Sequence, residues 1–293
     1  MGIRANINAG REFLLSNSVF PAPHFREFRI HRRYNLGNHL RQVVNAVRFA
    51  ELHQVPSVRL PADSFFMPGQ VGDVRLLEHG TADQVRPILV GDFFYYEKLG
   101  VDIQNLQRAR VLRNLRPLAI DLQATEPVEK LGIHLRAGDA FEPNPHPSYM
   151  PPPLSFFLES IQKSNRRIGG GVHLVCQELS HPYVEPIKAF CKLEGIRLEI
   201  SSSSLSEDFR LLASFRELCL SQGTLGLAAA WLSAHCQRVF AFERESNEIS
   251  TTLELGLQVD EAASAVPFGA WQALPEQIAR LTDISASPLI WRR

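Results

Sequence analysis

The residues of this sequence with the clearest potential for chemistry follow a short apolar stretch near its middle. His134 and Arg136 alternate at the end of an expected strand over 131–135, and Gly138 and Asp139 come next. An arginine at the carboxyl end of a strand presents a planar fork of N–H donors, which suits a phosphate group. In the alternative interpretations, Arg136 pairs with Asp139 or another carboxylate, and His134 is a hydrogen-bonded histidine of the core.

A second candidate is a polar turn in the last third of the chain. It consists of Ser221, Gln222, Gly223 and Thr224 and lies between an expected short strand and an expected helix over 225–233. The first turn of a helix has unpaired backbone N–H groups and the positive end of the helix dipole, so this arrangement favours an anion. The alternative is that Ser221 or Thr224 only caps the helix. The chain has no G-x-x-x-x-G-K-[ST] loop and no G-x-G-x-x-G fingerprint.

Two further stretches have residue types that suit a binding or catalytic role. Gly37 and Asn38 lie in an expected glycine turn before the first long helix, with Asn38 as its N-cap. The proline-rich stretch 142–153 contains Glu142 and His146, and its prolines predict a stiff loop on which a side chain can be held in place. The alternatives are an ordinary strand-to-helix turn and a loop that only routes the chain.

The composition excludes several classes of protein. The 293 residues include 31 basic and 31 acidic side chains, and this balance argues against a dedicated nucleic-acid-binding protein. Apolar residues make up 45% of the chain, enough for a packed core. The four cysteines have neither a C-x-x-C pair nor zinc-finger spacing, which predicts buried free thiols. Without a secretory signal pattern or an apolar run near the ~20 residues that span a bilayer, we expect a soluble, cytoplasmic protein with no transmembrane segment.

The elements that must position these residues alternate between short apolar strands and amphipathic helices, a pattern typical of α/β proteins with parallel sheets. The expected strands are 28–30, 58–60, 87–90, 131–135, 172–176, 196–200, 218–220 and 239–242, and the expected helices are 38–50, 153–163, 186–193, 204–215 and 225–233. Ser204 and Glu207 form a capping box. We therefore expect two Rossmann-like domains, 1–120 and 121–293, with parallel sheets facing a central cleft that holds the ligand.

Taken in order, these stretches resemble one family, the inverting fucosyltransferases of the GT-B type, which comprise the α-1,2, α-1,6 and protein O-fucosyltransferases. The family signature H-x-R-R-x-D corresponds to His134-Leu135-Arg136-Ala137-Gly138-Asp139. An upstream glycine turn of the family corresponds to residues 36–40, and a late block corresponds to Asp208-Phe209 followed by 221–232. The resemblance extends from about residue 28 to about residue 242 and implies a GT-B-like fold.

The resemblance also implies an activity and a set of binding residues. The activity is metal-independent transfer of a sugar, expected to be fucose from GDP-fucose, to a hydroxyl of a glycan or glycoconjugate acceptor. Arg136 would hold the β-phosphate and stabilise the departing diphosphate. The residues implied in donor binding are Gly37, Asn38, His134, Arg136, Asp208, Ser221, Gln222, Gly223 and Thr224. The first domain would then be the acceptor side, the second the donor side, and the lack of a D-x-D triad implies no bound metal.

The catalytic base is expected to be Glu142, which stands four residues before His146-Pro147 as an acidic residue does in the α-1,6 members. Asp139 and His146 are rival bases, because an inverting transfer needs a carboxylate or imidazole beside the attacking hydroxyl. Ala137 replaces a second arginine that is common in the α-1,2 and α-1,6 members. Two alternatives follow: the same fold with another nucleotide sugar, such as one carrying rhamnose or xylose, and a catalytically inactive carbohydrate-binding relative.

Overall fold

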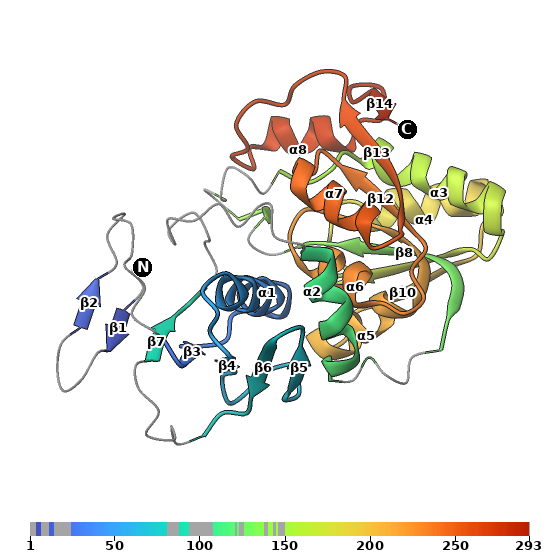
Figure 1. Cartoon of the computed structure of the whole chain (residues 1–293). Coiled ribbons are helices and arrows are strands. Elements are labelled where there is room, and N and C mark those ends of the chain that lie inside the picture. Colours follow the sequence, from blue (N-terminus) through green and yellow to red (C-terminus); the bar gives the residue numbers. More distant parts are fainter. Residues whose placement is uncertain are drawn as a thin grey trace. The chain divides into compact units, whose positions relative to one another are not determined.

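The structure is a computed structural model that describes residues 4–6, 12–14, 25–80, 88–93, 108–120, 122, 126–137, 140–142, 145 and 150–292. The chain divides into two compact units, Met1–Gln123 and Ala124–Arg293. Each unit has a seven-stranded sheet of its own, accompanied by helices (Figure 1). Parallel strands form the centre of both sheets, so the predicted α/β class with Rossmann-like sheets is confirmed.

The first unit has the strand order β2-β1-β7-β3-β4-β6-β5. Its elements are β1 (Arg4–Asn6), β2 (Glu12–Leu14), β3 (Glu27–Ile30), α1 (Leu36–Leu52), β4 (Ser57–Arg59), β5 (Gly69–Val71), β6 (Val74–Leu77), β7 (Ile88–Gly91), α2 (Arg108–Leu115) and the 3-10 helix η2 (Arg116–Leu118). Strands β7, β3, β4 and β6 are parallel, whereas β5 and the pair β1–β2 are antiparallel edges. The sheet is therefore parallel at its centre and mixed at its margins.

Helix α1 packs on the centre of this sheet through a buried apolar stripe. The buried positions of the stripe include Leu36, Leu40, Val43 and Val47. The prediction of a turn at Gly37 with Asn38 as N-cap is wrong, because the helix begins at Leu36 and Asn35 is its N-cap. The His39 N–H already donates to the Asn35 carbonyl at 2.8 Å. Gly37 and Asn38 therefore lie in the first turn of the helix.

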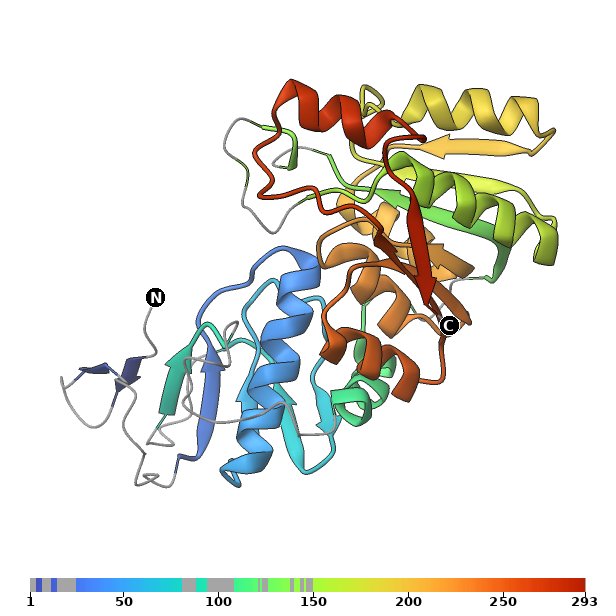
Figure 2. The same cartoon turned by 90° about the horizontal axis from the view of Figure 1, so that it is seen from above.

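The second unit has the strand order β10-β9-β8-β11-β12-β13-β14. Its elements are β8 (Val128–Leu135), α3 (Leu154–Ile168), β9 (Val172–Cys176), α4 (Val184–Leu193), β10 (Leu198–Ser201), α5 (Leu205–Ser214), β11 (Phe215–Cys219), α6 (Leu225–Leu232), β12 (Arg238–Phe242), α7 (Ser246–Glu254), β13 (Gln258–Ser264), α8 (Pro275–Thr282) and β14 (Leu289–Arg292). All neighbouring pairs are parallel except β13 and β14. Figure 2 shows this sheet with helices against it.

The first six strands of this unit, counted along the chain, lie in the order 3-2-1-4-5-6. This is the doubly wound order, in which the direction of winding reverses between the first and fourth strands. Here those strands are β8 and β11, which pair in parallel with Leu218 opposite Gly132 and Cys219 opposite Ile133. Open α/β sheets bind ligands at the carboxyl ends of the strands where this reversal occurs. The end of β8 and the end of β11 thus define the place to look for a site.

Alternation along β8 decides which side chains reach that place. Leu131, Ile133 and Leu135 are buried in a core cluster to which α3, α4 and α8 also contribute. Successive strand residues point to opposite faces, so His134 and Arg136 belong to the other face. Contact with α6 agrees with this, since a Cβ on Gly226 would lie 3.4 Å from His134 Nδ1.

Most predicted elements of the second half are confirmed, and two expectations need correction. The strands predicted at 131–135, 172–176, 196–200, 218–220 and 239–242 correspond to β8, β9, β10, β11 and β12. The strand at 239–242 is not the last, because β13 and β14 extend the sheet beyond it. The helix predicted to run through Phe215 ends at Ser214, since Phe215 pairs with Val128 as the first residue of β11.

Among the described helices, none has the length and apolar character that a membrane-spanning segment needs.

Candidate functional site

Arg136 follows the last residue of β8 and lies at the winding reversal of the second sheet. Its backbone N–H donates to the Ser221 hydroxyl at 3.1 Å, and Ser221 comes just after β11. The same hydroxyl shares a hydrogen bond of 3.2 Å with His134 Nδ1. Ser221 is buried and joins the ends of the two strands. The structure therefore brings together His134, Arg136 and Ser221, which belong to two separate stretches of the sequence.

His134 is uncharged at neutral pH in this environment. Burial lowers its pKa to about 4, and the nearby guanidinium groups of Arg136 and Arg244 and the imidazole of His181 act in the same direction. The positive charge at this end of the sheet therefore comes from the arginines, with His134 serving as a neutral hydrogen-bonding partner of Ser221.

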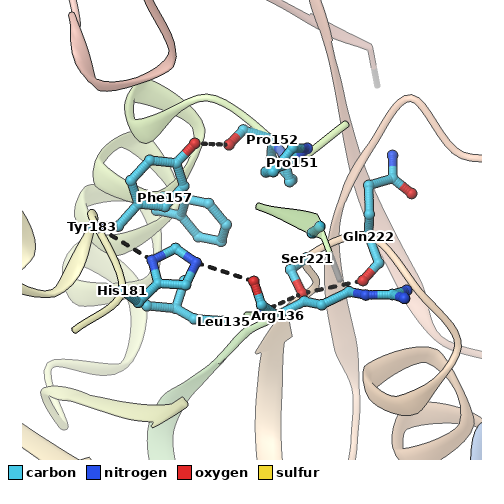
Figure 3. Close-up of a pocket in the computed structure, with 10 residues that line it drawn as sticks. Leu135, Arg136, Pro151, Pro152, Phe157, His181, Tyr183, Ser221 and Gln222 are labelled. Atoms are coloured by element: carbon cyan, nitrogen blue, oxygen red, sulfur yellow. Dashed lines mark hydrogen bonds between the residues drawn. The ribbon is translucent and has the colours of Figure 1, made fainter. Parts of the chain in front are cut away.

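The turn between β11 and α6 lies directly against the Arg136 side chain. Gly223 has a φ of 104°, and a Cβ at this position would be 2.5 Å from Arg136 Nη1. Figure 3 shows the Arg136 side chain running along the Ser221–Gln222 part of this turn. A residue other than glycine would have both a strained backbone and a clash with the guanidinium. Thr224 is the N-cap residue of α6 by position, without a side-chain capping hydrogen bond.

A pocket opens beside Arg136 and Ser221 (Figure 3). Its lining residues are Leu135, Arg136, Ala140, Pro151, Pro152, Phe157, His181, Tyr183, Ser221 and Gln222. Its walls are mostly apolar, with polar groups from Arg136, His181 and Ser221 among them. Pro151 and Pro152 belong to the proline-rich stretch 142–153, so part of that stretch forms a wall of the pocket.

His181 holds the backbone of Arg136, a role that the sequence analysis did not predict. The Tyr183 N–H donates to His181 Nδ1 at 3.2 Å, so Nδ1 carries a lone pair and Nε2 carries the proton. The Nε2–H group then donates to the Arg136 carbonyl at 3.1 Å. Burial lowers the pKa of His181 to about 4, which keeps this neutral form at physiological pH. Both the N–H and the carbonyl of Arg136 are therefore tied to side chains.

The loop after Arg136 has a second anchor in Trp271. The buried indole N–H of Trp271 donates to the Ala140 carbonyl at 2.8 Å. The Phe141 ring lies edge-on to His181 at 5.0 Å and to Trp271 at 6.2 Å. These contacts fix the backbone just before Glu142, whose side chain is exposed. A lone tryptophan 131 residues from its partner gives no local sequence signal for this contact.

Two of the three candidate bases cannot be placed. Asp139 and His146 lie outside the described residues, and so does Gly138. Glu142 is described and exposed at the end of the anchored loop. The choice among the three therefore stays a prediction, as does the alternative of an ion pair between Arg136 and Asp139.

Asp208 lies in the first turn of α5 and accepts a hydrogen bond from the serine-rich loop that follows β10. Its Oδ1 accepts from the Ser203 N–H at 3.2 Å, and burial raises the pKa of this carboxyl group. The predicted capping box of Ser204 and Glu207 is confirmed immediately before it. Donor binding by Asp208 stays a prediction.

The carboxyl edge of the first sheet is organised around a buried glutamine. Gln42 Nε2 donates to the carbonyls of Arg32 and Asp92 at 3.0 and 2.9 Å. Gln42 Oε1 accepts from the Tyr34 N–H at 3.1 Å and lies 3.2 Å from His39 Nδ1. Burial lowers the pKa of His39 to about 4. Gln42 thus joins the loops after β3 and β7, and Gly37 and Asn38 lie in the same helix, one turn earlier.

The described part of the chain was searched for side chains that could bind a metal ion together. No group of three or more His, Cys, Asp or Glu side chains there is placed to hold a metal ion. All four cysteines are free and buried, as predicted. Burial raises the pKa of the Cys191 thiol to about 11, and it also raises the pKa of Cys176 and Cys219. Thiolate chemistry at these residues is therefore disfavoured.

Comparison with known proteins finds only distant likenesses. No protein-family model matches the sequence, and no curated protein is significantly similar to it. Among solved structures, the bacterial iron-containing dodecameric glycosyltransferase TibC from enterotoxigenic E. coli aligns with 74% of this chain and 58% of its own, at 13% identity and a TM-score of 0.38. A mutant of Arabidopsis thaliana FUT1 in complex with GDP aligns over 78% of this chain and 73% of its own, at 11% identity and a TM-score of 0.44.

A third solved structure, the E. coli heptosyltransferase WaaC with ADP, aligns over 85% of this chain and 96% of its own, at 11% identity and a TM-score of 0.38. A second TibC structure is covered over 65% of its length, so this chain spans less than two thirds of the TibC chains. Identities of 11–13% and TM-scores of 0.38–0.44 do not establish a family. The function of this chain therefore rests on the geometry of its own site.

Proposed function

We propose that this chain is a glycosyltransferase that binds the diphosphate of a nucleotide sugar at the reversal between β8 and β11. The observation that carries the proposal is the position of Arg136. Its N–H is bonded to Ser221, its carbonyl is bonded to His181, and its guanidinium lies against Gly223. The two hydrogen bonds fix the backbone from which the Arg136 side chain extends, and the Gly223 turn lies against the guanidinium, so the charge is directed to this turn.

The proposed chemistry uses this charge at the leaving group. Breaking the bond between sugar and diphosphate places negative charge on the phosphate oxygens, and a fixed guanidinium stabilises that charge most in the transition state. His134 is neutral, so the positive charge near the leaving group comes from the arginines. Glu142 is the proposed base for the acceptor hydroxyl, with Asp139 and His146 as rivals, and the transfer inverts the sugar configuration without a metal.

The finer details of the proposal come from the sequence resemblance. GDP-fucose is the proposed donor and a glycan or glycoconjugate hydroxyl the acceptor, with the second unit as the donor side and the first as the acceptor side. A donor carrying rhamnose or xylose is the nearest alternative. An inactive carbohydrate-binding relative is the alternative from a different class, because Ala137 stands where a second arginine is common in the α-1,2 and α-1,6 members.

The test is a binding and turnover panel on the full-length chain. Thermal shift and calorimetry with GDP, ADP and UDP, each alone and as sugar conjugates, identify the base and sugar, because a ligand of the folded state raises the melting temperature. Donor hydrolysis or transfer then separates an enzyme from an inactive relative. Binding of none of these nucleotides would refute the proposal.

Arg136→Ala gives the residue-level test. We expect it to lower turnover by about 10²–10³-fold, the range for removing one charge-stabilising donor. Arg136→Lys should rescue poorly, because a point charge lacks the planar fork. Arg166→Ala removes an exposed arginine on α3 and is the matched control, which should leave turnover unchanged. Near-normal activity of Arg136→Ala would refute the assignment.

A further inference from the structure

A second arginine lies behind the turn that faces Arg136. Arg244 follows β12, and the residue between them, Glu243, has a left-handed backbone with a φ of 44°. This conformation is uncommon for a residue other than glycine and is stabilised here by two hydrogen bonds to β13. The Glu243 N–H donates to the Ala262 carbonyl at 2.9 Å, and Glu243 Oε1 accepts from the Ser264 N–H at 2.9 Å. The chain therefore bends at Glu243, and Arg244 reaches the turn between β11 and α6.

The Arg244 guanidinium binds the carbonyls of that turn. Nη1 donates to the Gly223 carbonyl at 3.0 Å, and Nη2 donates to the Ser221 carbonyl. Glu248, one helical turn later in α7, lies 3.4 Å from Nη1. The side chains of Arg244 and Glu248 are only 7% and 4% exposed. Arg244 is therefore buried, and its guanidinium donates hydrogen bonds to backbone carbonyls of the turn.

These two hydrogen bonds determine where the amide groups of the turn point. In a trans peptide the carbonyl of one residue and the N–H of the next point in opposite directions. Because the carbonyls of Ser221 and Gly223 point at Arg244, the N–H groups of Gln222 and Thr224 point away from it. Arg136 lies against the same turn at Gly223. The turn thus has one arginine on its carbonyls and another beside its glycine.

We propose that Arg244 is a positioning residue for the donor diphosphate, acting through the Ser221–Thr224 turn rather than by touching the ligand. The inference rests on the proposed function. By fixing the turn, Arg244 keeps the amides of Gln222 and Thr224 oriented toward an anion held by Arg136. Glu248 fixes the guanidinium in turn. Arg244 also adds positive potential at this end of the sheet, as its effect on His134 indicates.

The test separates the conformation of the turn from binding. Arg244→Met removes the charge and the donors but keeps most of the stem, Arg244→Lys keeps the charge without the fork, and Glu248→Gln loosens the guanidinium. Arg167→Met is the matched control, because it breaks the Arg167–Glu217 ion pair in the same unit without touching the turn. Hydrogen exchange of the peptide that covers 221–225 is measured without ligand, and affinities for inorganic pyrophosphate, GDP and guanosine are measured by calorimetry.

We expect Arg244→Met to raise amide exchange in 221–225 and to weaken pyrophosphate and GDP binding by on the order of ten-fold, with guanosine unaffected. Arg244→Lys should fall between Arg244→Met and wild type, and Arg167→Met should change neither readout. If Arg244→Met does not fold, amide exchange and pyrophosphate affinity of Arg244→Lys and Glu248→Gln are compared with those of the wild type instead. Wild-type exchange or wild-type pyrophosphate affinity in these variants would overturn the positioning role. If the wild type binds neither pyrophosphate nor GDP, the proposed function fails instead, whatever the exchange shows.

Discussion

The buried histidines of the second unit make its free energy of unfolding depend on pH. His134 and His181 both have a pKa near 4 in the folded chain, against an ordinary value of 6.5. The unfolded chain therefore binds protons between pH 6.5 and 4 that the folded unit does not bind. Their contribution to stability is fully present above pH 6.5 and is lost as the pH falls toward 4. At pH 5 the loss amounts to roughly 2 kcal/mol for each histidine.

Urea unfolding followed by tryptophan fluorescence measures this effect in the right unit. All three tryptophans, Trp231, Trp271 and Trp291, belong to the second unit, so their emission reports on its unfolding. We expect the free energy of unfolding to fall by about 4 kcal/mol between pH 7.5 and pH 5 from His134 and His181 together. His173, whose pKa is also lowered by burial, adds to the same trend.

The variant His181→Gln isolates one of the two groups. A glutamine offers one donor and one acceptor in place of Nε2–H and Nδ1, so the partners Arg136 and Tyr183 keep their type of hydrogen bond. We expect this variant to lose about 2 kcal/mol of the pH dependence. Lys188→Gln, which removes an exposed ion pair on α4, serves as the control and should leave the pH dependence unchanged. An undiminished pH dependence in His181→Gln would show that this histidine is not held neutral.

Three further predictions concern the site directly. Gly223→Ala should weaken GDP binding and cost at least about 1 kcal/mol of stability, because the new Cβ meets Arg136 at a left-handed backbone position; calorimetry and urea unfolding check both parts, and wild-type binding would contradict the proposed contact. Glu142→Gln should retain donor affinity while turnover falls by about 10²–10⁴-fold. Full activity of Glu142→Gln would place the base elsewhere. Activity should persist after exhaustive EDTA treatment, and a loss that Mg²⁺ or Mn²⁺ restores would show a metal requirement.

The sequence by itself determined those features of the fold that depend on near neighbours. The capping box of Ser204 and Glu207 was predictable because its two hydrogen bonds span three residues. The strand over 172–176 and the start of α6 at Leu225 were also predictable, from an apolar run and a polar turn. Periodicity failed where burial was partial, as in β13, whose residues Gln258–Ser264 do not alternate clearly between apolar and polar.

The boundary of α1 shows the limit of local reasoning. Asn38 is a good N-cap residue by type, yet Asn35 takes that position. The tertiary contacts of Gln42 explain the difference, because its amide oxygen accepts from the Tyr34 N–H and holds the chain at the preceding loop. The start of α1 is thus fixed by Gln42, eight residues beyond Tyr34. The residue types near Asn38 give no sign of this contact.

Only the tertiary structure decided which candidate residues form one site. Arg136 and Ser221 are 85 residues apart and meet because β8 and β11 are neighbours at the winding reversal. His181 and Trp271 fix the Arg136 loop from 45 and 131 residues away. Hydrogen bonds between distant segments depend on strand order, and strand order is selected by the packing of both faces of the sheet together. Residue types and spacing therefore indicated the chemistry of Arg136, whereas its orientation followed from the fold.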